Sequence, residues 1–162
     1  MMTCGVSATG KPLTKKFVWI NLMDSVFLSL SRDDAKGLFA SRDEESLVRF
    51  VSAVYEQKNG SVDVIKTSTR WQDLKAALAV LDDDGILDFI TNGSRPLLQE
   101  ESRCVFVVRP DLVGHVATTL NAIEEDSLVE TNIASLVSEL TGFYQRASEN
   151  KMCTVFTTGV ID

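Results

Sequence analysis

The sequence predicts a single α+β domain, with about five helices packed on a small mixed or antiparallel sheet. Apolar runs rich in Val, Ile and Phe alternate with longer segments of helical periodicity. The length of 162 residues suits one domain. Hydrophobic residues make up 44% and charged residues 24%, which is an ordinary globular mix. This composition excludes a disordered tail, a collagen-like repeat and a disulfide mini-protein.

The chain begins with a segment that lacks a strong helical or strand pattern. Residues 1–16 contain two glycines and a proline, and we expect a flexible arm there, so that the domain spans residues 17–162. Aromatic and β-branched residues then predict strands at Lys16–Met23 and Ser25–Leu30.

Two helix starts are predicted after these strands, because a carboxylate follows a serine by three residues. The pairs are Ser31 with Asp34 and Ser41 with Glu44. Asn59-Gly60 ends the second helix, and Ser61–Lys66 predicts a short strand. The second helix carries its apolar stripe at Leu47, Val48, Val51, Val54 and Tyr55.

The middle of the chain predicts two more helices and the clearest strand. A helix begins at Thr69-x-x-Gln72 and ends at the acidic turn Asp82–Gly85. A shorter helical stretch ends at Asn92-Gly93. Arg103–Arg109 predicts a strand that is apolar on both sides, which is typical of a strand inside the sheet.

The last part predicts two long helices and a closing strand. Pro110 suits the first position of a helix, and a second helix is expected at about 131–149 from its 3.6-residue apolar period. Gly142 lies inside that helix, at a cost of ~1 kcal/mol relative to Ala. Lys151–Thr158 predicts the final strand.

Charge is unevenly distributed along the chain. Residues 1–81 carry 11 basic and 9 acidic side chains, whereas residues 82–162 carry 5 and 14, and the net charge is −7. A net acidic surface repels phosphate, so a general nucleic-acid binder is not expected. By analogy with small acidic bacterial proteins, we expect a non-enzymatic protein-binding module, such as an inhibitor or immunity-type partner of a basic protein. The candidate binding residues are Asp82, Asp83, Asp84, Asp88, Glu124, Glu125 and Asp126.

The alternative is a small enzyme or ligand-binding domain that uses His115 with nearby carboxylates. His115 is the single histidine, so any Cys/His or Ser/His/Asp scheme must use it. Cys104 lies in the predicted strand just before the helix of His115 and is the candidate partner. An apolar environment raises a thiol pKa, which argues against Cys104 as a nucleophile. Whether the protein is an enzyme, and whether it is a structural homo-oligomer, stay open.

No cofactor or metal is expected from the motifs. Gly5–Lys11 matches the spacing of a phosphate-binding loop, but no strand precedes it and Pro12 replaces the required hydroxyl. Asp82–Gly85 resembles part of a calcium loop, but Val80 and Thr91 occupy its first and last ligand positions.

The cysteine pattern favours the cytoplasm. Three cysteines without a C-x-x-C motif give neither a disulfide framework nor a zinc knuckle. No run of about 18 uninterrupted apolar residues predicts a membrane span. Phe17–Leu30, preceded by lysines, resembles a signal peptide, but Asn21 and Asp24 interrupt its apolar core. Secretion therefore stays the minor alternative.

Several short segments resemble one known family. They are Val26–Ser31, Trp71-Gln-Asp-Leu74, the strand Arg103–Arg109, Leu120–Ile123 and Phe143–Ala147. In this order they are similar to the YfbM-like family of small bacterial α+β proteins of unknown function. The resemblance covers residues 25–157 and implies a fold but no activity. The chain departs from it at Lys75, where the family has a histidine, and between Asp126 and Asn132, where an Ile-Tyr-Pro-like segment is absent.

Overall fold

The computed structural model describes residues 25–67, 70–82, 84–124 and 131–161. The predicted arm and the predicted strand Lys16–Met23 lie outside these ranges.

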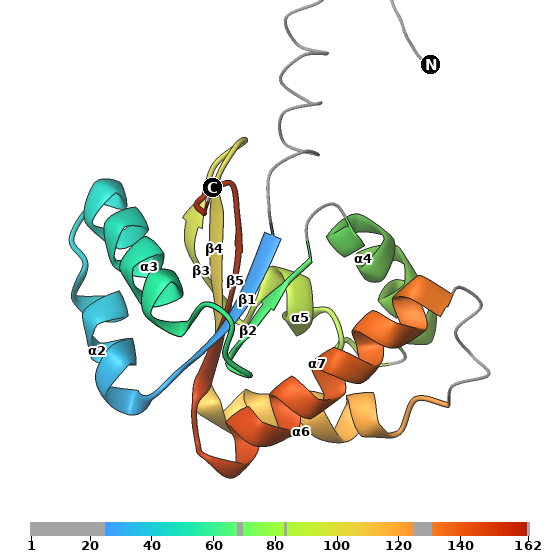
Figure 1. Ribbon diagram of the computed structural model, residues 1–162. Coiled ribbons are helices and arrows are strands. Elements are labelled where there is room, and N and C mark those ends of the chain that lie inside the picture. The colour runs from blue at the N-terminus through green and yellow to red at the C-terminus, as the bar shows by residue number, and fades with distance from the viewer. Residues whose placement is uncertain (1–24, 68–69, 83, 125–130, 162) are drawn as a thin grey trace, which may run out of the picture.

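The centre of the molecule is a five-stranded, fully antiparallel sheet with the order β2-β1-β5-β4-β3 (Figure 1). The last strand of the chain, β5, is therefore the middle strand, and its Phe156 is the partner of Phe27 on one side and Phe106 on the other. The strands are β1 (Ser25–Leu30), β2 (Val64–Lys66), β3 (Arg95–Gln99), β4 (Cys104–Val108) and β5 (Cys153–Thr158).

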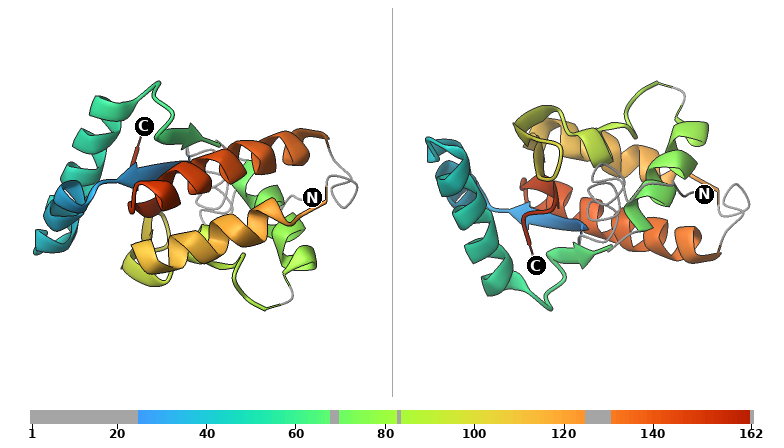
Figure 2. Two further views of the ribbon diagram at one scale, coloured as in Figure 1. Left: turned by 90° about the horizontal axis from the view of Figure 1, so that it is seen from below. Right: turned by 90° about the horizontal axis from the view of Figure 1, so that it is seen from above.

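Helices cover both faces of the sheet, but unequally (Figures 1 and 2). One face carries two helices and the other carries four, so the described residues form a single α+β domain with six helices. None of them is both long and apolar enough to cross a membrane. The first face has α2 (Arg32–Ala40) and α3 (Glu44–Lys58), and the second has α4 (Arg70–Leu81), α5 (Phe89–Asn92), α6 (Pro110–Asn121) and α7 (Thr131–Glu149).

The alternation of side chains along each strand produces two hydrophobic cores. In β4, Val105 and Val107 pack on the side of α2 and α3, whereas Phe106 and Val108 pack on the side of α6 and α7. The prediction that this strand lies inside the sheet is confirmed. An aromatic cluster fills the larger core, where the rings of Phe27 and Phe156 are 4.7 Å apart.

One predicted helix start differs from the structure. The N-cap of α3 is Asp43, not Ser41, and its carboxylate accepts the Ser46 N–H at 2.7 Å. Ser41 instead ends α2 and donates its hydroxyl to the Gly37 carbonyl at 3.1 Å. A carboxylate directly before the helix competes successfully with a hydroxyl two residues earlier.

The strand β3 was not predicted from the sequence. It is an edge strand with exposed Arg95, Pro96 and Gln99, so its apolar signal is weak. Proline lacks the N–H that a central strand needs, and here it is accommodated at the edge, next to a register shift between Pro96 and Leu98.

Candidate functional site

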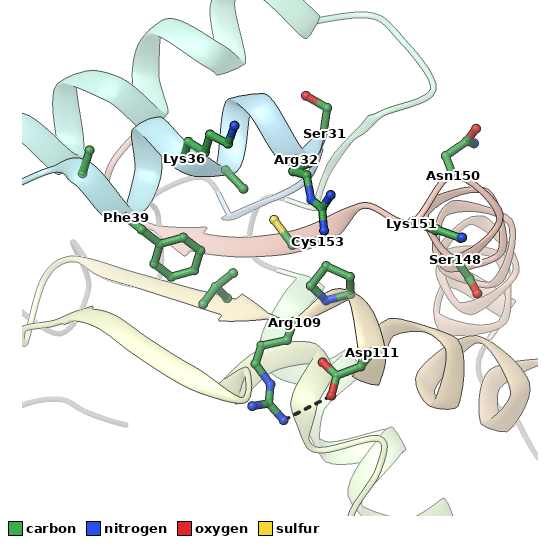
Figure 3. A pocket seen from close by; sticks show the side chains of 14 residues that line it. Ser31, Arg32, Lys36, Phe39, Arg109, Asp111, Ser148, Asn150, Lys151 and Cys153 are labelled. Atoms are coloured by element: carbon green, nitrogen blue, oxygen red, sulfur yellow. Dashed lines mark ion pairs between the residues drawn. The ribbon is translucent and has the colours of Figure 1, made fainter.

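A pocket of about 1210 Å³ lies where three strand ends meet (Figure 3). At this end of the sheet, β1 leads into α2, β4 leads into α6, and the turn after α7 leads into β5. The nine residues of α2, a length of about 14 Å, form one wall of the pocket. Val107 of β4 and Cys153 of β5 also border the pocket but are themselves buried.

The lining comes from three parts of the chain that are far apart in the sequence. The residues are Ser31, Arg32, Ala35, Lys36, Phe39, Ala40, Val107, Arg109, Pro110, Asp111, Ser148, Asn150, Lys151 and Cys153. Four of these side chains are basic and one is acidic. In a chain with a net charge of −7, the pocket is therefore a local concentration of positive charge.

Two of the four cations are neutralised by neighbours. The Arg109 guanidinium lies 3.3 Å from the Asp111 carboxylate and points away from the centre of the pocket (Figure 3). The Lys36 ammonium lies 3.7 Å from Asp33. Exposed pairs of this kind contribute little to stability, typically ~0–1 kcal/mol.

The other two cations, Arg32 and Lys151, have no carboxylate at ion-pair distance within the part of the chain that the structure describes. Figure 3 shows the Arg32 side chain extending from α2 toward the middle of the pocket. Lys151 lines it from the turn between α7 and β5. An anion that enters the pocket therefore meets two positive charges that no described carboxylate pairs with.

Lys151 also has an unusual backbone. Its φ is +55°, and it is the one residue other than glycine with positive φ in the described ranges. It ends α7 in a Schellman motif, in which the Met152 N–H donates to Ala147 and the Lys151 N–H donates to Ser148. Glycine is the usual residue at this position because a Cβ costs ~1–2 kcal/mol there. The fold thus keeps a lysine where its own geometry favours glycine.

The first turn of α6 adds positive potential to the pocket. Its N-cap, Arg109, makes no side-chain cap, and Pro110 occupies the first helical position. Helix N-termini carry roughly half a positive charge, which favours an anion nearby.

Chemistry at Cys153 is suppressed by its surroundings. This thiol lines the pocket but is 2% exposed. Burial raises its pKa to about 11, so the group stays a neutral thiol at physiological pH. The lining contains no histidine and one carboxylate, and its residues favour binding of an anion over acid–base chemistry.

The acidic residues expected to bind a partner lie elsewhere, and Asp82 has a structural role. Its carboxylate accepts the backbone N–H groups of Gly85, Leu87 and Asp88, each at 3.1 Å, and so it shapes the turn after α4. The other described members, Asp84, Asp88 and Glu124, are exposed. Asp83, Glu125 and Asp126 lie outside the described residues.

His115 and Cys104 are not joined by any hydrogen bond in the described structure. His115 is exposed on α6 and lines neither the large pocket nor a smaller one of about 180 Å³ between α6 and α7. The Cys104 sulfur lies 3.6 Å from the Glu100 carbonyl oxygen. A joint role of His115 and Cys104 in catalysis or ligand binding stays a prediction. Among the described residues, no group of three or more His, Cys, Asp or Glu side chains is placed to hold a metal.

Sequence reasoning missed the cationic pocket because its members are scattered. Arg32 and Lys151 are separated by most of the chain and line one pocket only because of the strand order. One signal was present in the sequence, namely an arginine followed by a proline between a strand and a helix. That junction places a helix N-terminus at a strand end, a common location for anion sites.

Comparisons with known proteins support the fold and do not assign an activity. No protein-family model matches the sequence, and no curated protein matches it either. Among solved structures, the chain is similar to the crystal structure of YfbM from Escherichia coli, a protein of unknown function. The TM-score is 0.60 at 11% sequence identity, over 84% of this chain and 99% of that chain. The resemblance predicted from the sequence is confirmed at the level of the fold.

Proposed function

We propose that this protein binds a small anionic molecule in the pocket between α2 and the β4–α6 junction. The observation that carries the proposal is a pair of cations, Arg32 and Lys151, that have no carboxylate partner among the described residues of a net acidic chain. The proposal belongs to the ligand-binding class expected from the sequence, but it moves the site away from His115.

Electrostatics supports an anionic ligand over a neutral one. The interaction of two unit charges at 4 Å is ~1 kcal/mol in bulk water and ~4 kcal/mol near a protein surface. A concave wall lined by one sign of charge strengthens this local attraction. The overall charge of −7 acts over longer distances, where salt screens it beyond ~8 Å. The local cations therefore dominate inside the pocket.

The size of the pocket supports a ligand larger than a single ion. Small-molecule sites are typically ~300–1,000 Å³, and this pocket has about 1210 Å³. The Ser148 hydroxyl is a further donor in the lining, whereas the Asn150 side-chain amide donates to the Arg146 carbonyl at 2.8 Å.

The test is calorimetric titration of inorganic phosphate and pyrophosphate at low salt. We expect both to bind, and pyrophosphate to bind more tightly because it offers more charge. Arg32→Ala should weaken pyrophosphate about tenfold, which corresponds to ~1.4 kcal/mol and to the loss of one charge-assisted hydrogen bond.

Arg42→Ala is the matched control, because it removes one exposed arginine just after α2 that does not line the pocket. Its affinity for pyrophosphate should equal that of the native chain. Equal losses in the two variants would mean that the effect is one of net charge, and the proposed site would be wrong.

The protein-binding module predicted from the acidic C-terminal half stays a second candidate. Asp84, Asp88 and Glu124 are exposed, as such a surface requires. The two functions use different residues and do not exclude each other.

A further inference from the structure

We infer that the ligand of this pocket joins an anionic group to a flat apolar body, as aryl phosphates and aryl carboxylates do. The inference rests on the proposed function, because it names the class of molecule that the same pocket takes. It comes from the apolar side chains of the lining, which the charge argument does not use.

The key observation is the exposed ring of Phe39 at the pocket. It is 46% exposed, and the other large hydrophobic residues that are exposed in the described structure, Val62 and Val80, are aliphatic and lie outside the pocket. Single exposed apolar residues are common on protein surfaces. An exposed aromatic ring inside a concave site is the usual means of holding a flat apolar group.

Phe39 is supported from outside the pocket. The guanidinium carbon of Arg95, on the edge strand β3, lies 5.4 Å from the ring centroid. Arg95 does not line the pocket, whereas Phe39 does. The cation therefore holds one side of the ring and leaves another side available to a ligand.

The helix α2 sets the spacing between the two kinds of wall. Arg32 and Phe39 are seven residues apart, which places them on one helical face at a separation of about 10 Å along the axis. Between them on this face are Ala35 and Lys36, and Ala35 is small enough to leave room. Figure 3 shows Arg32 and Phe39 at opposite ends of this face.

Pro110 at the start of α6 adds to the apolar lining. It is exposed and lines the same pocket as Phe39. A flat body between Phe39 and Pro110 places its anionic substituent near Arg32. The arrangement fits a bicyclic aromatic group with one charged end.

The experiment compares three probes that separate the charge from the body: inorganic phosphate, 1-naphthyl phosphate and 1-naphthol. We expect 1-naphthyl phosphate to bind about tenfold more tightly than inorganic phosphate, because contact between its rings and Phe39 raises the affinity by up to that factor. Phe39→Ala should remove this advantage and leave the affinity for inorganic phosphate unchanged. Val80→Ala, which truncates an exposed apolar residue outside the pocket, should change neither affinity.

The outcomes separate the two proposals. If inorganic phosphate and 1-naphthyl phosphate bind equally and Phe39→Ala has no effect, the inference on the apolar body is wrong while the anion site stands. If 1-naphthol binds as tightly as 1-naphthyl phosphate and Arg32→Ala has no effect, the anion site is wrong. If none of the probes binds, both are wrong. Phe39→Leu, which keeps apolar bulk without the ring, should retain the fold and lose most of the advantage.

Discussion

Lys151 is the residue at which stability and binding are most clearly opposed. Its left-handed backbone costs ~1–2 kcal/mol that a glycine avoids, whereas glycine loses ~0.5–1 kcal/mol through the entropy of the unfolded chain. We therefore expect Lys151→Gly to raise the free energy of unfolding by about 0.5–1 kcal/mol, measured in urea. The same change should weaken pyrophosphate binding several-fold.

Lys151→Ala is the control for that prediction. It removes the same ammonium group but keeps a Cβ in the strained conformation. Its affinity should fall as in Lys151→Gly, while its stability should stay close to that of the native chain. A native-like affinity in both variants would show that this lysine does not contact the ligand.

Gly142 shows how a residue that sequence reasoning treats as a defect can have a local cause. A Cβ at this position would lie 3.1 Å from the Arg146 Nη1 atom. The glycine leaves room for the Arg146 guanidinium, which donates to the Val62 carbonyl at 3.1 Å and so joins α7 to the loop before β2. The sequence shows the cost of the glycine in the helix, but only the structure shows the arginine beside it.

The helix α3 begins with a titratable cap, Asp43. The Asp43 carboxylate caps the helix, and the hydrogen bond from the Ser46 backbone N–H holds its pKa below the ordinary value of 3.8. A carboxyl with a lowered pKa in the folded state stabilises that state above its unfolded pKa, and the contribution is lost as the pH falls through the folded value. The cap should therefore weaken only in acid.

The prediction is that Asp43→Ala lowers the urea midpoint at pH 7, and that its difference from the native chain shrinks at pH 3 and below. Asp43→Asn is the control, since its side-chain oxygen still caps the helix but does not titrate. Its midpoint should stay near the native one at pH 7. A difference between Asp43→Ala and the native chain that is the same at both pH values would contradict a role for the carboxylate charge.

Elements with a strong period could be predicted from the sequence, and elements that depend on neighbours could not. The final helix follows from its 3.6-residue period, and β4 from its apolar run, because burial on both faces leaves a direct trace in composition. β3 left no such trace, since an edge strand with Pro96 has one side in solvent. The pocket depends on strand order, which sets Arg32 beside the β4–α6 junction and which no local pattern contains.

At the scale of the whole molecule, the unequal cover of the sheet explains where a site can form. Four helices close one face around the aromatic cluster, while α2 and α3 cover the other face, where the large pocket lies beside α2. The two helices on that side still bury a second hydrophobic core, which includes Leu30 and Val155. The pocket beside α2 is therefore available for binding without loss of either core.

The distribution of charge is the other property of the whole molecule, and it separates the two proposed functions. The acidic surface predicts a basic protein partner, so we expect Asp88→Lys combined with Glu124→Lys to release any such partner that the native chain captures from a lysate at low salt. Both side chains are exposed, so reversing their charge replaces attraction to a basic partner with repulsion. The capture uses low salt because surface charges are screened beyond ~8 Å at physiological salt. Mass spectrometry of the retained proteins is the measurement.

Glu56→Lys combined with Asp73→Lys is the matched control, because it changes the net charge equally at exposed positions in the first half of the chain. A partner held by the acidic half should survive this control, leave at high salt, and stay bound in Arg32→Ala. Loss of the partner in the control as well would mean that the net charge of the chain, and not the acidic surface, causes the release. Loss in Arg32→Ala instead would place the partner at the cationic pocket, and the acidic half would then serve only to keep a chain of net charge −7 in solution.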